Sequence, residues 1–206
     1  METIINRVKN VLVSPKTEWA VIEAENTPHA KVFTSYVLLL AIIPAVAAFI
    51  GYGLIGPKGY RAAADLAAAL GVSSASTNLL SLGLRQAIVQ YITMLGGAYL
   101  TAFVIDALAA NYGARKDFNR AFSLVAYAYT PMFVGGVFYV LPSLSWLASL
   151  AGLYGLYLLY IGLQPMMKAP EDKQTAYFVV SLIVTVVVLV VLSAVLAAVL
   201  LKGKLF

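Results

Sequence analysis

The sequence predicts an all-α, polytopic integral membrane protein with five transmembrane helices and an amphipathic N-terminal interfacial segment. The first observation is composition: 62% of the 206 residues are hydrophobic and 11% are charged, whereas soluble domains are roughly 45–50% apolar and about 25% charged. The second is that the few charged residues divide the chain into uncharged runs, several of which reach the roughly 20 residues that cross a bilayer. A disordered chain is excluded, because it would need low hydrophobicity.

Composition also limits the chemistry. The chain has no cysteine and a single histidine, His29, which excludes disulfides, thiolate catalysis and cysteine-ligated metals. The sequence contains no Ser–His–Asp set, metal motif or glycine-rich phosphate loop. We therefore expect no enzymatic activity, no catalytic residues, no cofactor and no metal. The basic residues behind the net charge of +5 lie in short connectors, which favours anionic lipid headgroups over nucleic acid as their partners.

Residues 1–31 are predicted to form a cytoplasmic or interfacial amphipathic segment. Apolar residues recur there at helical spacing, and polar residues lie between them. Ser14 and Pro15 then open a second helix, as N-cap and first-turn residue. The segment has no apolar core of a signal peptide, so we expect it to be retained. It is either a partner-binding or lipid-sensing platform or a plain membrane anchor. The expected interfacial anchors are Arg7, Lys9, Trp19 and Trp146.

Five spans make up the predicted transmembrane domain, residues 32–201. Val32–Pro57 and Gln86–Ile105 contain no charged residue and supply the first two spans. Ala121–Met167 is also uncharged but too long for one helix, and Pro142 divides it into two. The last span is the most aliphatic stretch of the chain. The expected spans are 32–55, 86–110, 121–141, 144–163 and 176–201, and residues 202–206 form a short tail.

One further uncharged window, Leu66–Leu84, has the length of a span but is rich in glycine, serine, threonine and asparagine. We expect it to be a polar connector, with a six-span topology as the alternative. With five spans, nine basic residues lie on the side of the N-terminus and five on the other side. The positive-inside rule then places the N-terminus in the cytoplasm. The expected location is the prokaryotic cytoplasmic membrane.

Polar residues follow one face of each of three spans at helical spacing. Two interpretations remain open: inward-facing polar groups that join helices, or the lining of a hydrated path for a small solute or ion. These candidate residues are Gln86, Gln90, Thr93 and Thr101 on the second span, Arg120, Ser123, Tyr127 and Thr130 on the third, and Tyr154, Tyr157, Tyr160 and Gln164 on the fourth. Glycines that allow close helix packing are Gly97, Gly152, Gly155 and Gly162, and those of the fourth span could serve folding or a homodimer.

Asp106 is an acidic residue inside an apolar stretch, and such a residue is a functional hypothesis by default. It follows Gln86 by about 30 Å of helix, which places it near the membrane boundary. It is either a structural ion-pair partner of Arg120 or Lys116, or a group coupled to protons or ions.

The order of several motifs resembles the prokaryotic branch of the Yip family, the Ypt/Rab-interacting membrane proteins. Val13-Ser14-Pro15-Lys16-Thr17-Glu18-Trp19 precedes the first span, Ala121–Pro131 (AFSLVAYAYTP) opens the third, and Leu153–Leu163 (LYGLYLLYIGL) forms much of the fourth. The resemblance implies five spans and a cytoplasmic N-terminus, and it implies no catalytic residues. Eukaryotic members are associated with Rab GTPases and vesicle traffic. The positions that would recur in the family are Pro15, Trp19, Pro131, Tyr157, Tyr160, Gly162 and Pro170.

The expected function is that of a non-enzymatic membrane protein that organises the membrane or binds a partner. Its expected partners are the lipid bilayer, a protein at the cytoplasmic face and a second copy through the transmembrane helices, but no nucleic acid. The alternative is a small-solute or ion transporter or channel that uses the polar stripes of the second to fourth spans.

Overall fold

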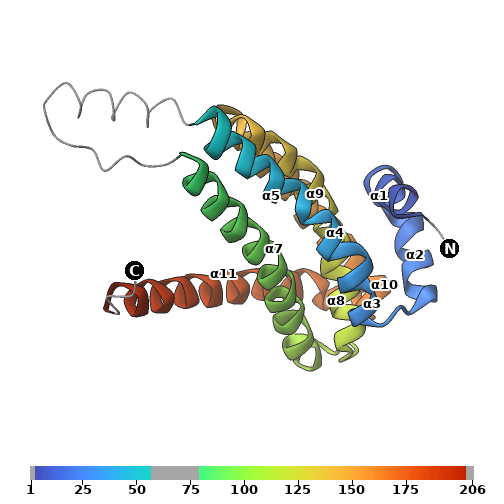
Figure 1. Cartoon of the computed structure of the whole chain (residues 1–206). Helices are drawn as coiled ribbons and strands as arrows, with labels where there is room; N and C mark the ends of the chain where they lie inside the picture. The colour runs from blue at the N-terminus through green and yellow to red at the C-terminus, as the bar shows by residue number, and fades with distance from the viewer. Residues whose placement is uncertain (1–2, 57–78, 203–206) are drawn as a thin grey trace, which may run out of the picture.

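The computed structural model of the chain describes residues 3–56 and 79–202, with side chains up to residue 191. The described residues form helices and turns and no strand (Figure 1). Five of the helices are long and apolar enough to cross a membrane. This confirms the all-α, five-span fold class. Residues 66–78 of the expected polar connector lie outside the described residues.

The N-terminal segment folds into two short helices, α1 (Ile4–Val13) and α2 (Pro15–Glu25), which we call the hairpin. Ser14 lies between them and closes the turn, because its N–H donates to the carbonyl of Asn10. The hydroxyl of Thr17 donates to the Ser14 carbonyl at 2.9 Å. Ser14 therefore occupies the expected N-cap position, but its side chain makes no cap hydrogen bond. Its backbone carbonyl accepts from the N–H of Glu18 in the first turn of α2.

The first span runs from His29 to Ile55 as one helical path of 27 residues. It contains two wider, π-helical turns, in which hydrogen bonds reach five residues along the chain. Its segments are α3 (His29–Val32), the π-turn η1 (Phe33–Val37), α4 (Leu38–Leu40), α5 (Ile42–Ala48) and the π-turn η2 (Phe49–Ile55). The helix begins three residues before the position expected from hydropathy, because His29 and Lys31 are tolerated in its first turn.

The second span, α7 (Leu79–Ala109) with the 3₁₀ turn η3 (Ala110–Tyr112), begins inside the window expected to be a connector. Residues 79–84 are helical. Four of them are leucines, which supply apolar surface, and the backbone of Gly83 packs against that of Gly53. A Cβ on Gly53 would lie 3.1 Å from the Cα of Gly83. The two helices thus cross closely at this end of the bundle.

The third span lies at the centre of the bundle. It consists of α8 (Phe118–Ala128), α9 (Thr130–Gly135) and the 3₁₀ turn η4 (Gly136–Val140). Of its most apolar window, 72% is buried inside the protein, against 17% for the fifth span. The third span therefore forms the core, and the fifth forms the periphery.

A short 3₁₀ turn, η5 (Pro142–Leu144), connects the third span to α10 (Trp146–Met167), as the proline at position 142 predicts. Helix α10 ends at Lys168, which adopts a left-handed conformation with φ of 53°. The last helix, α11 (Glu171–Lys202), then leaves across the direction of α7 (Figure 1). The N–H of Arg115, in the connector before α8, donates to the Met167 carbonyl at 2.7 Å.

The hairpin lies against α10 and α8 at a point that only glycine allows. Trp19 on α2 is 2% exposed. A Cβ on Gly162 would lie 2.8 Å from the Cε2 atom of Trp19 and 2.5 Å from the Cδ1 atom of Leu124. Real Cβ atoms do not approach this closely, so the missing side chain of Gly162 is what admits the indole.

This contact predicts that Gly162→Ala destabilises the protein by about 1–3 kcal/mol, the usual cost of adding a methyl group to a packed core. Gly152→Ala is the matched control on the same helix, because nothing lies within 4 Å of the Cβ it would add. Thermal unfolding of the detergent-solubilised protein measures both. Equal melting temperatures for the two variants would contradict the role of Gly162.

Candidate functional site

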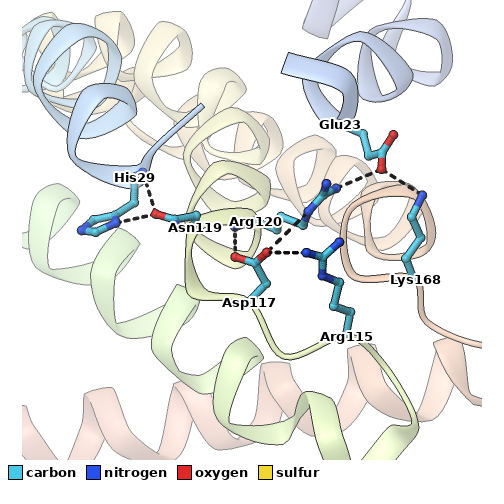
Figure 2. A network of polar contacts seen from close by, with 7 residues as sticks. All are labelled: Glu23, His29, Arg115, Asp117, Asn119, Arg120 and Lys168. Carbon is cyan, nitrogen blue, oxygen red and sulfur yellow. Dashed lines mark hydrogen bonds and ion pairs between the residues drawn. The ribbon is translucent and has the colours of Figure 1, made fainter. Parts of the chain in front are cut away.

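Charged residues gather where the hairpin meets the ends of the spans, and Figure 2 shows this cluster. We call it the hairpin network; it consists of Glu23, Arg115, Asp117, Arg120 and Lys168. These residues come from α2, from the connector before α8, from α8 itself and from the end of α10. The network therefore joins four segments that are far apart in the sequence.

Glu23 is the centre of the hairpin network. Arg120 donates from Nη1 to its Oε1 at 3.0 Å, and the ammonium group of Lys168 lies 3.1 Å from the same oxygen. The hydrogen bond from Lys168, followed by that from Arg120, lowers the pKa of Glu23 below its ordinary value. The carboxylate is thus ionised at neutral pH and bridges the two cations.

Asp117 organises the other side of the hairpin network. It is the N-cap of α8 and accepts the backbone N–H of Arg120 at 3.3 Å. Its second carboxylate oxygen lies 3.4 Å from Arg115 and 3.6 Å from Nε of Arg120. Helical side chains lean toward the N-terminus of their helix, so Arg120 reaches Asp117 and α2. No ion pair between Arg120 and Asp106 is present in the described contacts, unlike the pair considered from the sequence.

His29 fixes the start of the first span to the same end of α8. Its backbone N–H donates to Oδ1 of Asn119 at 3.0 Å, and its ring Nδ1 lies 2.7 Å from that oxygen. The imidazole also packs edge-on against Phe118, with ring centroids 5.3 Å apart. His29 thus acts as a structural link between the first and third spans (Figure 2).

A second charged cluster holds the hairpin together. Arg7 on α1 pairs with Glu18 and Glu25 on α2. The Arg7 and Glu18 side chains are each 7% exposed, and the guanidinium lies 5.6 Å from the ring centroid of Tyr127 on α8. Arg7, which the sequence marks as an interfacial anchor, is therefore a buried partner of two carboxylates and a central aromatic ring.

The stripe of the third span forms hydrogen bonds with residues that the sequence did not single out. The Thr130 and Tyr36 hydroxyls lie 2.7 Å apart, and Thr130 also donates to the Tyr127 carbonyl at 2.6 Å. Thr101 pairs with the hydroxyl of Tyr129 at 2.9 Å. Tyr36 was missed because it lies on the first span, where no polar stripe was recognised, and Tyr129 was missed because it lies off the stripe of the third span. Ser123 is buried in the same core, 4% exposed.

The stripes of the second and fourth spans diverge. Gln86 and Gln90 are half-buried and Thr93 is exposed. The Tyr154 hydroxyl donates to the Leu12 carbonyl at the end of α1, at 2.8 Å. Toward α11, Tyr160 pairs with Thr175 at 3.1 Å and Gln164 donates to Glu171 at 3.1 Å, whereas Tyr157 is 44% exposed. These hydrogen bonds therefore join the fourth-span stripe to α1 and α11.

The remaining expected residues have distinct surroundings. One oxygen of Asp106, Oδ1, is buried and has no hydrogen-bond partner among the described residues. The carbonyl of the preceding residue, Ile105, accepts from the Tyr177 hydroxyl at 2.5 Å. A Cβ on Gly155 would lie 2.9 Å from the Ala128 carbonyl, and one on Gly97 would lie 4.0 Å from the Tyr129 hydroxyl. Trp146 is 58% exposed and Lys9 is exposed, as interfacial anchors would be.

Three comparisons with known proteins place these features among relatives. The family model of the Yip1 domain matches residues 9–195. The inner membrane protein YohC of Escherichia coli strain K12 is 30% identical over 145 residues, which are 70% of this chain and 68% of that protein. YohC of Escherichia coli O6:H1 matches equally well. No solved structure matches. The match covers the hairpin from Lys9 onward, together with all five spans.

The buried pairing of Arg7 predicts a large effect of its removal. Arg7→Met should destabilise the protein by about 3 kcal/mol, because it removes the cation that pairs with the buried carboxylate of Glu18 and with the more exposed carboxylate of Glu25. Lys9→Met, on the same helix but exposed, is the control and should change the stability by less than about 0.5 kcal/mol. Protease cleavage of the hairpin, followed over denaturant concentration, measures both. Similar curves for the two variants would show that Arg7 contributes no more than a surface lysine.

Proposed function

Because the chain belongs to the Yip1 domain family and is a multi-pass membrane protein, we propose that it is non-enzymatic and acts as a membrane-organising, partner-binding protein through its N-terminal hairpin. The supporting observation is that the hairpin is fastened to the bundle at several independent points. Glu23 joins it to Arg120 and Lys168, Trp19 fits against Gly162, and Leu12 accepts from Tyr154. A plain anchor needs none of these contacts.

The outer face of the hairpin has the character of a contact surface. Ile5 is 79% exposed, Val13 72% and Val21 45%. Lys9 and Lys16 are exposed beside them. Apolar side chains with neighbouring positive charges suit a partner whose contact surface is apolar and acidic. Such a partner would meet the hairpin at a membrane surface that is itself anionic. The rigid attachment means that a partner bound there would be held in a fixed position relative to the bundle.

A homodimer through the fourth span is a further part of this proposal. Gly152 on α10 has nothing within 4 Å of the position of a Cβ, and Leu150 and Leu153 beside it are 51% and 63% exposed. A glycine on an exposed apolar face lets a second helix approach closely.

Transport stays the second candidate because of one observation: the buried Oδ1 of Asp106 has no hydrogen-bond partner within residues 3–56 and 79–191. An unsatisfied carboxylate oxygen in a spanning helix is costly unless it serves an ion or a proton. The hydrogen bonds of Tyr154, Tyr160 and Gln164 to α1 and α11 count against a path shared by the three stripes.

A photo-crosslinking amino acid at Ile5 or Val21 tests the main proposal in intact cells. We expect one defined protein adduct from both positions, which should disappear when Arg7→Met loosens the hairpin and persist with Lys9→Met. The same amino acid at Leu153 is the control, and an adduct of twice the chain mass there would support the dimer. No adduct from the hairpin, together with ion or solute flux in proteoliposomes that Asp106→Asn abolishes, would favour transport instead.

We propose that the N-terminus is cytoplasmic, because the basic residues are more numerous on its side of the membrane. The absence of native cysteine makes single-cysteine labelling direct. Lys116→Cys, in the connector at the hairpin end, should react with an impermeant maleimide only after the membrane is opened. Ser143→Cys, in the turn at the other end, should react in intact cells. The reverse pattern would invert the topology.

A further inference from the structure

A hollow of about 690 Å³ lies between α2, the end of α10 and the start of α11. Its size is within the range of small-molecule sites, about 300–1,000 Å³. Its lining combines the lysines Lys16 and Lys168, the amides of Gln164 and Gln174, the ring of Trp19 and the apolar Pro165. The lining thus offers several N–H donors over an apolar floor.

The indole N–H of Trp19 is the first sign that this hollow receives a ligand. The Nε1 atom has no hydrogen-bond partner in the described part of the chain. It is buried, as is the whole side chain of Trp19, which is 2% exposed. Buried tryptophan N–H groups nearly always have an acceptor, because leaving water without one is unfavourable. Trp19 contributes to the wall of the hollow. Because Nε1 is itself buried, the indole must shift for an acceptor in the hollow to satisfy this donor.

The charges around the hollow indicate an anionic acceptor. Lys16 is exposed and Lys168 has a side chain that is 55% exposed. Two carboxylates are close by: Glu23 binds Lys168 and Arg120, and Glu171 accepts from the amide of Gln164. Each carboxylate is thus already engaged by a donor, and an ammonium group has three N–H donors, so Lys168 retains capacity for a second anion.

The position of the hollow favours a lipid as the source of that anion. It lies at the end of the bundle where α10 and α11 meet through residues 168–170, and therefore at the level where spans enter and leave the membrane. Phospholipid phosphates are concentrated at this level, and the apolar Ile161 and Pro165 could contact the upper part of a lipid chain. We propose that this hollow binds the phosphate of an anionic phospholipid headgroup through Lys16, Lys168 and the indole N–H of Trp19. This site shares Lys16 with the hairpin's outer face, but it does not rest on the proposed partner-binding role.

Trp19 itself can report the binding. The chain has two tryptophans, so Trp146→Phe leaves the emission of Trp19 alone. Short-chain phosphatidylglycerol, titrated into the detergent-solubilised full-length protein, should shift this emission saturably, and phosphatidylcholine should not. Lys16→Gln should weaken the binding about fivefold, the ratio that matches the typical contribution of one lysine near an anionic surface. Lys9→Gln, which removes the same charge outside the hollow, should leave it unchanged.

A second variant separates the donor from the charge. Trp19→Phe removes the N–H together with part of the indole, which packs against Gly162, so the melting temperature should fall. Retention of phosphatidylglycerol by the folded protein, measured by native mass spectrometry, should fall as well. Equal loss with Lys16→Gln and Lys9→Gln would overturn the site, since it would reflect net charge alone. Saturation by inorganic phosphate at equal concentration would overturn the lipid source and identify a soluble phosphate. Loss of the crosslinked partner with unchanged lipid binding would contradict only the partner-binding role.

Discussion

The packing of Trp19 against Gly162 is the contact on which the arrangement of the N-terminal half depends. The indole occupies space that a Cβ on Gly162 of α10 would fill, and Leu124 on the central helix borders the same position. This brings α2 to lie along α10, so that Glu23 reaches Lys168 at one end and Leu12 reaches Tyr154 at the other. In a bundle surrounded by lipid there is little hydrophobic force between helices, so close contact and satisfied polar groups decide their positions. The hairpin is held by both.

The number of spans could be predicted because the rule behind it is simple. A helix in lipid must be apolar over a fixed length, and the uncharged runs of this sequence reveal that length directly. Pro142 marked the turn between the third and fourth spans for the same reason, since proline interrupts the helix hydrogen bonds. The start of the second span was missed because residues 79–84 continue from a polar window. What makes them helical is their contact with Gly53, on another helix, and hydropathy along one segment contains no information about that contact.

The candidate site was predicted less completely, for a physical reason. Helical periodicity shows which face of one helix is polar, but the partner of each residue depends on how the helices are rotated against one another. Arg120 was recognised as the polar end of a stripe, whereas its partner Glu23 lies 97 residues earlier in the chain. Arg7 was expected to be at the surface, because a charged residue on a short amphipathic helix usually is. It is buried because two carboxylates of α2 face it, and the sequence alone does not show that α2 folds back over α1.

The outward direction of α11 has a consequence for how this helix fits the bilayer. Tyr177, Ser181 and Thr185 bury the first part of this helix against the bundle, and from Val186 onward its described residues are mainly exposed. A helix fixed at one end and apolar at the other takes its tilt from the thickness of the hydrocarbon around it. Thin and thick bilayers would therefore impose different angles on α11 while the central helices keep theirs. The packed central helices would thus keep one arrangement, while the tilt of α11 would follow the thickness of the membrane.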